Sequence, residues 1–210
     1  TATTESYTLS LHDALPIWLI RCVAACVDDA AIVVTDVGKH QMWVAQAYPL
    51  RRPRQWLTSG GLGTMGFGVP TAIGAALAAP ERTVVCFTGD GSILMNIQEL
   101  VTAAEVQANL KIVLMDNAVL GLVHQQQTLF YGQGPVASTF QVLPDFTAAA
   151  RAFGIAAVDL DAAANPLAAL ADAFARPGPC LIHARIDALQ KVYPMVPPGA
   201  ANRDMIGAQA

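Results

Sequence analysis

The stretch Thr88-Gly89-Asp90-Gly91-Ser92 decides the fold because of what stands on either side of it. The apolar run Val84–Phe87 precedes it, and a helical pattern over Ile93–Ala108 follows it, so a buried strand ends in a carboxylate. The glycines permit a sharp turn and a close approach to a ligand, and the amides of Gly91 and Ser92 open a helix whose positive end favours phosphate. A carboxylate beside a diphosphate predicts a bridging Mg²⁺, which takes oxygen ligands from protein and phosphate together.

A second oxygen ligand follows the next predicted strand. Lys111–Met115 is apolar and ends in Asp116-Asn117, and Asn117 stands 27 positions after Asp90 (117 − 90). Successive parallel strands end on one edge of a doubly wound sheet, so Asp90 and Asn117 can share one ion. An isolated Gly-Asp-Gly is more often an ordinary turn, but the strand before it, the helix after it and the second strand end favour a ligand site.

Strands and helices alternate along the whole chain, which predicts an α/β fold with a doubly wound parallel sheet and helices on both faces. The predicted strands are Ile32–Asp36, Gln55–Thr58, Val84–Phe87, Lys111–Met115, Ala156–Asp159 and Cys180–Arg185. The predicted helices are Trp18–Ala31, Met42–Ala47, Phe67–Ala79, Ile93–Ala108, Leu120–Tyr131, Asp145–Phe153 and Pro166–Ala175.

Composition excludes several classes of function. A net charge of −4 and a pI of about 5.4 provide no basic surface for nucleic acid. The apolar runs are interrupted before the eighteen or so residues that a membrane span needs, so neither a nucleic-acid nor a membrane partner is expected. The four cysteines stand in apolar surroundings, which favours reduced core thiols in a cytoplasmic protein.

The two ends of the chain are predicted to differ from the domain between them. Residues 1–17 read TATTESYTLSLHDALPI, lack the features of a secretory signal, and resemble a translated sequencing-library adapter, so a non-native leader is expected there. Residues 18–190 form the cofactor-binding domain. Residues 191–210 form a proline-containing arm, which packs over a cleft or wraps the surface, and the sequence favours neither alternative.

The interval between Asp90 and Asn117 resembles the fingerprint of the thiamine-diphosphate enzymes. In that family a Gly-Asp-Gly is followed by Asn-Asn, whose second member binds Mg²⁺, whereas this chain has Asp116 in the first place, which leaves the local hydrogen bonding open. The resemblance makes the carbonyl of Val119 the third ligand. The pattern G-x-G-x-x-G at Gly61–Gly66 would suggest NAD, but a weak preceding strand and the turn at Pro80–Arg82 argue against a dinucleotide site.

A closer resemblance covers about Asp36 to Gly207. Over this range the chain resembles the C-terminal, diphosphate-binding domain of the acetohydroxyacid synthase (acetolactate synthase) catalytic large subunit, and its QQQ run, its LFY segment and its tail resemble the enterobacterial isozyme I type. The motifs that carry the resemblance are GKHQMW from Gly38, SGGLGTMG from Ser59, GDGS from Gly89, NIQE from Asn96 and LGLVHQQQ from Leu120.

The resemblance implies a role for each matching residue. Asp90, Asn117 and the Val119 carbonyl would hold Mg²⁺. Gly63 would accept a hydrogen bond from the cofactor's aminopyrimidine, and Met65 would be the apolar wedge that bends the cofactor. The implied cofactor-binding residues are Gly38, His40, Gln41, Gly63, Met65, Gly89, Gly91, Ser92, Asn117, Gly121 and Leu122.

Gln126 stands where most members of the family have a Trp that lines the site of the second substrate. Gly63, Met65 and Gln126 are therefore the residues implied to act in catalysis. Gln126 could instead face solvent on its helix, and His124 two residues earlier is more often a solvated helix residue than a catalytic one.

The implied activity is that of a thiamine-diphosphate carboligase, which condenses pyruvate with pyruvate or 2-oxobutyrate in branched-chain amino-acid biosynthesis. FAD, a homodimer or larger oligomer with a shared active site, and a regulatory small subunit are expected in the full-length enzyme. The family's catalytic glutamate belongs to an N-terminal domain of the partner subunit, so this chain is expected to be an inactive fragment. Glyoxylate carboligase, a catabolic FAD-free acetolactate synthase and a non-catalytic binding module remain alternatives.

Overall fold

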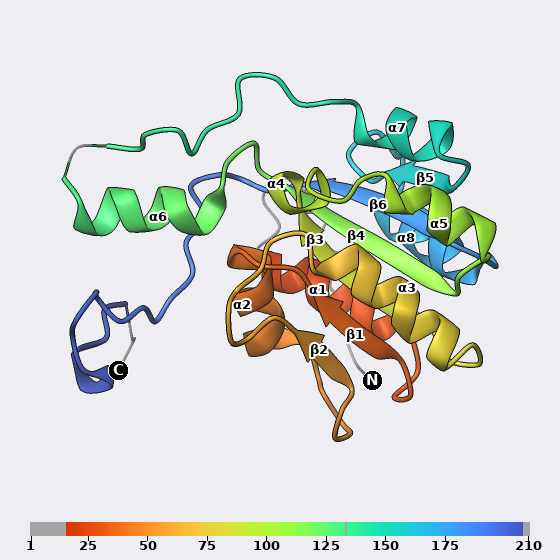
Figure 1. The fold of residues 1–210 in the computed structure, drawn as a ribbon, viewed down its shortest axis with the longest axis horizontal. Coiled ribbons are helices and arrows are strands. Elements are labelled where there is room, and N and C mark those ends of the chain that lie inside the picture. The colour runs from red at the N-terminus through yellow and green to blue at the C-terminus, as the bar shows by residue number, and fades with distance from the viewer. Residues whose placement is uncertain (1–15, 133, 208–210) are drawn as a thin grey trace, which may run out of the picture.

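The computed structural model describes residues 16–132 and 134–207 and contains an open parallel sheet (Figure 1). All of its strand pairs are parallel, which confirms the predicted doubly wound fold. The sheet has six strands in the order β2-β1-β3-β4-β6-β5. The strands are β1 (Ile32–Thr35), β2 (Trp56–Thr58), β3 (Val84–Gly89), β4 (Leu110–Asp116), β5 (Ala156–Asp159) and β6 (Cys180–Arg185).

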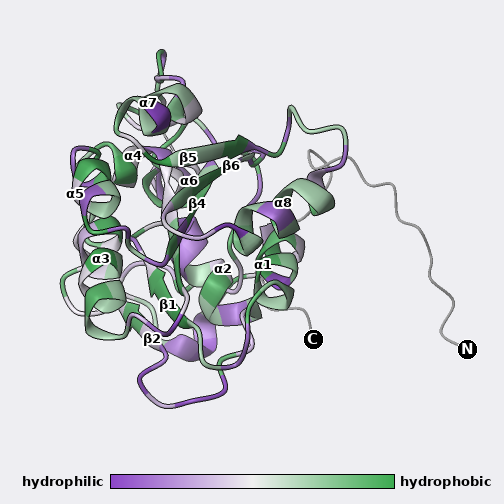
Figure 2. Ribbon diagram, turned by 90° about the vertical axis from the view of Figure 1, so that its right-hand side faces the viewer, coloured by the Kyte–Doolittle hydropathy of each residue, from purple (hydrophilic) through white to green (hydrophobic). Residues whose placement is uncertain are grey.

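Helices cover both faces of the sheet, as Figure 2 shows edge-on. Helices α3, α5 and α7 pack on one face, and α1, α2 and α8 pack on the other. Among the described residues, no helix combines the length and apolar character needed to cross a bilayer. The helices are α1 (Pro16–Ala25), α2 (Lys39–Ala47), α3 (Gly68–Ala78), α4 (Asp90–Ile93), α5 (Glu99–Glu105), α6 (Gly121–Phe130), α7 (Phe146–Ala152), α8 (Pro166–Ala175) and the 3₁₀ helix η1 (Asn202–Asp204).

The central strands are apolar along their length because both of their faces are covered. Every residue of β3 is buried, and β4 is buried from Leu110 to Met115. Alternate β3 residues face opposite cores, so Phe87 packs in the layer that contains α2 and Cys86 packs in the layer that contains α3. This two-sided burial is the reason that the strands read as continuous apolar runs rather than as alternating ones.

The strand order reverses between β1 and β3, since β1 also pairs with β2 on its other side. Ligands of open α/β sheets bind outside the carboxyl ends of the strands at such a reversal. The loops that follow β1, β3 and β4 therefore converge on the place where the sequence predicts the diphosphate.

Three predicted helices differ from the observed ones by three residues or more, and one of them, Met42–Ala47, begins at Lys39. The pattern over Ile93–Ala108 is not one helix, because α4 ends at Ile93 and α5 begins at Glu99. Between the two helices, the side-chain amide of Asn96 donates a hydrogen bond to the carbonyl of Gly66 at 2.7 Å. This contact accompanies the break between α4 and α5. The predicted helix Trp18–Ala31 ends early at Ala25, and the Asp28 side chain accepts from the amide of Ala30 in a turn before β1.

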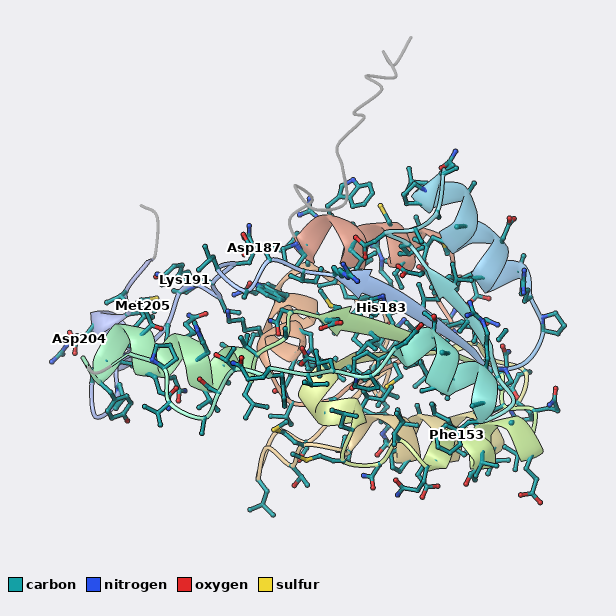
Figure 3. The ribbon with its side chains drawn as sticks, turned by 90° about the horizontal axis from the view of Figure 1, so that it is seen from above. Phe153, His183, Asp187, Lys191, Asp204 and Met205 are labelled. Carbon is teal, nitrogen blue, oxygen red and sulfur yellow. The ribbon has the colours of Figure 1, made fainter. Side chains whose placement is uncertain are left out.

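The described parts of the predicted leader and of the predicted arm make different contacts with the domain. Residues 1–15 of the predicted leader lie outside the described residues, and α1 begins at Pro16 with Ile17 packed on the core. The arm runs along α6, beyond the sheet, and Figure 3 shows Asp204 and Met205 there, well away from His183. Gln125 of α6 holds the arm with two hydrogen bonds to the backbone of Val192, at 2.8 and 2.9 Å.

Candidate functional site

A pocket of about 230 Å³ opens at the carboxyl ends of β1, β3 and β4. Every predicted site residue except Gln41 lines it, although they come from segments as far apart as residues 38 and 126. Gln41 instead donates to the hydroxyl of Thr58 at 2.7 Å. The predicted residues in the lining are Gly38, His40, Gly63, Met65, Gly89, Asp90, Gly91, Ser92, Asn117, Val119, Gly121, Leu122 and Gln126.

Asp90 connects the ends of the two central strands. Its side chain is buried, and its carboxylate accepts from the amide of Gly91 at 2.7 Å and from the amide of Asn117 at 3.1 Å. Burial and a hydrogen bond with Asp116 raise the pKa of Asp90 to about 7, although the two backbone amides act to lower it. A buried carboxylate in this state is a suitable ligand for a cation, which would stabilise its charged form.

Asn117 and Val119 stand beside Asp90 in the turn that follows β4. The side-chain oxygen of Asn117 lies 3.3 Å from the amide of Val119, in a turn whose middle residue, Ala118, has a φ of 56°. Asn117 and Val119 both line the pocket, so the turn brings an amide side chain and a buried backbone segment next to the carboxylate of Asp90. The structure thus brings the three predicted metal-binding residues together.

The structure resolves the hydrogen bonding of Asp116, the residue that departs from the family's pattern. Its carboxylate lies 3.0 Å from Nε2 of His183 on β6 and accepts from the amide of Ala118 at 3.1 Å. Burial acts to raise the pKa of Asp116, but the hydrogen bonds from His183, Asp90 and Ala118 outweigh burial and lower it. Asp116 therefore lies between Asp90 and His183 and does not line the pocket, whereas Asn117 does.

His40 provides a buried polar atom that points to a ligand. Its Nε2 is buried without a hydrogen-bond partner among the described residues, and its ring lines the pocket. Burial lowers the pKa of His40 to about 4, against the raising effect of Asp36, so the imidazole is neutral near pH 7. Gly38 and Gly89 make room for this ring, because a Cβ on Gly38 would lie 2.9 Å from it and a Cβ on Gly89 would lie 3.2 Å from it.

Asp36 is a residue of the site that the sequence analysis did not identify. It is buried at the end of β1, and its carboxylate accepts from the amides of Val37, Gly66 and Gly68 at 2.8, 2.9 and 2.8 Å. These bonds attach the glycine-rich loop that carries Met65 to the edge of the sheet. The signal in the sequence was an acidic residue at a predicted strand end, the same signal that identified Asp90.

Lys39 lines the pocket, unlike Asp36, and was not predicted as a site residue. It is the first residue of α2, and its Nζ donates to the carbonyls of Ala188 and Gln190 at 3.1 and 2.7 Å. Burial is the main cause that lowers the pKa of Lys39 to about 8, with Asp187 acting in the opposite direction. No local pattern could reveal the link between α2 and residues 188–190, because about 150 positions separate the partners.

Helix α6 separates residues that the sequence analysis grouped together. Gln126 is exposed and lines the pocket, whereas its neighbour Gln125 is buried and holds the arm. His124 is not part of the lining. The exposure of Gln126 is compatible both with contact to a second substrate and with a residue that only faces solvent.

The donor set fits a divalent cation with a diphosphate. Carboxylate, amide and carbonyl oxygens are the ligands that Mg²⁺ takes, and the unpaired Nε2 of the neutral His40 donates to a phosphate oxygen in the tautomer that carries its proton there. The absence of a side chain at Gly91 lets Leu120 pack close to the start of α4, because a Cβ on Gly91 would lie 2.6 Å from a methyl group of Leu120. The arrangement can therefore hold an anionic cofactor through a shared ion.

Comparison with known proteins agrees with this geometry. Residues 36–184 match the family model described as thiamine pyrophosphate enzyme, C-terminal TPP binding domain. The chain is 65% identical over 189 residues to the acetolactate synthase isozyme 1 large subunit of Escherichia coli (strain K12), which covers 90% of the chain and 34% of that protein. It is 49% identical over 175 residues to the isozyme 2 large subunit of the same organism, covering 83% of the chain and 32% of that protein.

A third relative extends the match beyond that organism. The acetolactate synthase large subunit of Lactococcus lactis subsp. lactis (strain IL1403) is 44% identical over 198 residues, which covers 93% of the chain and 34% of that protein. The chain thus spans about a third of the length of these relatives. The fold, the pocket and these matches together show that the chain belongs to the thiamine pyrophosphate enzyme family and contains its C-terminal, TPP-binding domain.

Proposed function

We propose that this chain is the cofactor-binding domain of an acetolactate synthase, which uses thiamine diphosphate and Mg²⁺ to join pyruvate to a second 2-oxoacid. The observation that carries the proposal is the convergence of Asp90 and Asn117, from adjacent strand ends, in the pocket that Met65 and Gly63 also line. The names of the similar proteins support the choice of reaction, since all three are acetolactate synthase large subunits.

Each group in the pocket has a distinct task in this proposal. Asp90, Asn117 and the Val119 carbonyl hold Mg²⁺, and Ser92, Gly91 and His40 face the diphosphate. The hydroxyl of Ser92 already donates its one hydrogen to the carbonyl of Val37 at 3.0 Å, so the backbone amide of Ser92 is the group that serves the diphosphate in this proposal. The ion offsets the repulsion between Asp90 and the phosphate oxygens, so cofactor and cation bind together.

The glycine-rich loop positions the reactive part of the cofactor. When bound, thiamine diphosphate supplies the electron sink for the decarboxylation of a 2-oxoacid. The half-buried side chain of Met65 presents an apolar surface in the pocket, and the backbone of Gly63, with a φ of 65°, lies two residues before it. Met65 supports the bent cofactor in this scheme, and the Gly63 carbonyl accepts from its amino group.

Further parts of the enzyme complete the site. The pocket of about 230 Å³ is smaller than the roughly 300–1,000 Å³ typical of small-molecule sites, so this chain supplies one wall. A second large subunit, with its catalytic glutamate, supplies the other wall in our proposal. FAD and a regulatory small subunit belong to the complete assembly, which acts in the cytoplasm on pyruvate and 2-oxobutyrate, and the words "large subunit" in the names of the relatives support the small subunit.

Binding of the cofactor tests the metal site. Isothermal calorimetry on the 210-residue chain should detect thiamine diphosphate only when Mg²⁺ is present, and Asp90→Asn should remove this binding. The control is Asp172→Asn, which changes an exposed aspartate on α8. Equal affinity in EDTA, or in the Asp90 variant, would mean that Asp90 does not hold the ion.

A chimera tests the reaction. Residues 36–184 of this chain would replace the matching segment of the E. coli isozyme 1 large subunit, to which the chain is 65% identical. We expect the chimera to form acetolactate from pyruvate, and we expect the 210-residue chain alone to form none, because it lacks the second wall and the acid that position the cofactor. An inactive but folded chimera that still binds thiamine diphosphate would contradict the proposed reaction, and turnover by the isolated chain would contradict the shared site.

A further inference from the structure

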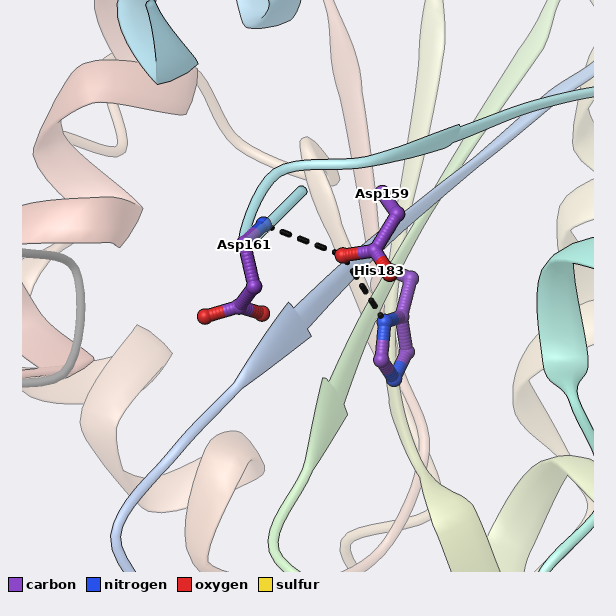
Figure 4. Close-up of side chains that lie close together, drawn as sticks. All are labelled: Asp159, Asp161 and His183. Carbon is purple, nitrogen blue, oxygen red and sulfur yellow. Dashed lines mark hydrogen bonds and ion pairs between the residues drawn. The ribbon is translucent and has the colours of Figure 1, made fainter. Parts of the chain in front are cut away.

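A second group of potential metal ligands lies outside the cofactor pocket, at the carboxyl ends of β5 and β6. Asp159 ends β5 and pairs in register with His183 of β6, so their side chains are cross-strand neighbours. Asp161 follows two residues later, and Figure 4 shows the three side chains close together. These residues take no part in the cofactor pocket.

The spacing of the three residues suits a single ion. One nitrogen of His183 and one carboxylate oxygen of each aspartate all lie within 4.8 Å of one another, and Nδ1 of His183 is 3.4 Å from Oδ1 of Asp159. Ligand atoms about 2.1 Å from an ion are at most roughly 4.2 Å apart, so the group needs to contract by less than about 1 Å. A side-chain rotation at half-buried Asp161 can supply that movement.

The orientation of His183 is the second observation that points to a ligand. His183 is 6% exposed, and its Nε2 lies 3.0 Å from the carboxylate of Asp116, which fixes the ring. Its Nδ1 is buried and faces Oδ1 of Asp159 at 3.4 Å without a well-aligned hydrogen bond among the described residues, and Asp116 and Asp159 together raise the pKa of His183 against its burial. When Nε2–H donates to Asp116, the lone pair of Nδ1 faces a carboxylate, and this contact is repulsive unless a positive charge lies between the two atoms.

The loop that carries the two aspartates is held in place before any ion arrives. The amide of Asp161 donates to Oδ1 of Asp159 at 3.0 Å, and Oδ2 of Asp161 accepts from the amide of Arg185 at 2.8 Å. Histidine ligands of metals commonly donate their other N–H to a carboxylate, which is the role that Asp116 has toward His183. The loop and the ring of His183 are thus fixed by hydrogen bonds, and the remaining contraction falls to the Asp161 side chain.

An acidic pocket gives an ion access to His183 and Asp159, whereas Asp161 is not part of the lining of this pocket. A polar pocket of about 600 Å³ is lined by His183 and by the carboxylates of Asp116, Asp145 and Asp159. Arg185 is the one Arg or Lys in its lining. The excess of carboxylates favours a cation, and the pocket leaves room for water to complete the coordination.

We propose that Nδ1 of His183, with the carboxylates of Asp159 and Asp161, binds a divalent first-row transition-metal ion at a site separate from the cofactor. One imidazole and two carboxylates form a mixed nitrogen and oxygen set, which favours Mn²⁺, Fe²⁺, Co²⁺ or Zn²⁺ over Mg²⁺ and Ca²⁺. The competing arrangement is a proton on Nδ1, which would make His183 an imidazolium bridge between Asp116 and Asp159 without a metal.

Manganese titration distinguishes a metal from a proton. Mn²⁺ would be added to the 210-residue chain, without thiamine diphosphate or phosphate, and the unbound ion would be measured by electron paramagnetic resonance. We expect one bound Mn²⁺ that persists in Asp90→Asn and in Asp172→Asn. Asp159→Asn, Asp161→Asn and His183→Gln should each weaken this binding by roughly tenfold or more, and Asp116→Asn should do so by about 10- to 100-fold.

Two controls keep the test independent of folding. Circular dichroism would show whether each variant retains its secondary structure, and Asp161→Asn changes only a half-buried loop residue. In the unmodified chain, pulsed resonance should detect nitrogen coupling to Mn²⁺ that disappears in His183→Gln. The proposal is overturned if no Mn²⁺ binds up to about 1 mM, the weak end of biological divalent-cation affinities, or if folded variants of Asp159, Asp161 and His183 bind it as the unmodified chain does.

Discussion

The carboxylate of Asp36 stabilises the loop that carries Met65, and Asp36→Asn tests this directly. Asn retains one acceptor oxygen, which can still serve the amides of Val37 and Gly66, but its NH₂ group then faces the amide of Gly68, which now bonds to Oδ2 at 2.8 Å. A buried amide left unpaired costs about 1–3 kcal/mol, and the loss of charge weakens each remaining bond by about 1 kcal/mol. With two remaining bonds, we expect the free energy of unfolding to fall by about 3–5 kcal/mol in total.

Urea denaturation followed by circular dichroism measures this change. The midpoint should decrease while the slope stays constant, since the surface exposed on unfolding is unaltered. Asp172→Asn on the exposed face of α8 is the matched control and should change stability by no more than about 0.5 kcal/mol. A loss below about 1 kcal/mol in Asp36→Asn would show that the three amides do not depend on the second oxygen, and would refute the reasoning.

Three further predictions concern the pocket and its surroundings. Gly91→Ala places a Cβ 2.6 Å from a Leu120 methyl group and should lower the free energy of unfolding, measured by urea denaturation, by about 1–3 kcal/mol. Gly74 is exposed on α3 with no atom near its Cβ, so Gly74→Ala should raise the free energy of unfolding. Equal effects of the two substitutions would contradict the crowding argument. In the active chimera, Gln126→Trp should raise the ratio of acetohydroxybutyrate to acetolactate by up to about 10- to 200-fold in competition between the two oxoacids, and an unchanged ratio would remove Gln126 from the acceptor site. Lys39→Gln should accelerate amide hydrogen exchange in residues 186–193 because the contacts of Nζ with two carbonyls there are lost, and unaltered exchange would mean that the arm is held by other contacts.

The fold follows from the sequence mainly where strands are buried on both faces. The predicted bounds of β5, β6 and α8 coincide with the observed ones, because Asn165 caps α8 just before Pro166 and apolar runs end at turns. The break between α4 and α5 could not be predicted from periodicity, since the residues there are compatible with a helix. The break is associated with a contact from Asn96 to Gly66, a residue of a distant loop.

The site residues also differ in whether the sequence alone could identify them. Asp90 and Asn117 could be identified because each ends a strand and both strands belong to one sheet edge. Lys39 and His183 could not, because their partners lie far away in the sequence or in another strand. The effect of Asp116 in place of Asn was left open, since the sequence does not reveal that His183, two residues before Arg185, the register partner of Asp116, extends its side chain to Asp116.

The loop at Gly66 is restrained on both sides of one residue, since its amide donates to Asp36 and its carbonyl accepts from Asn96. A segment fixed in this way has little conformational freedom left to lose when a ligand arrives. Ordering a mobile side chain costs about 0.5–1.5 kcal/mol at an interface, and a preorganised loop avoids much of that cost. The backbone next to Met65, which lines the pocket, is therefore fixed by the folded chain before a ligand arrives rather than ordered during binding.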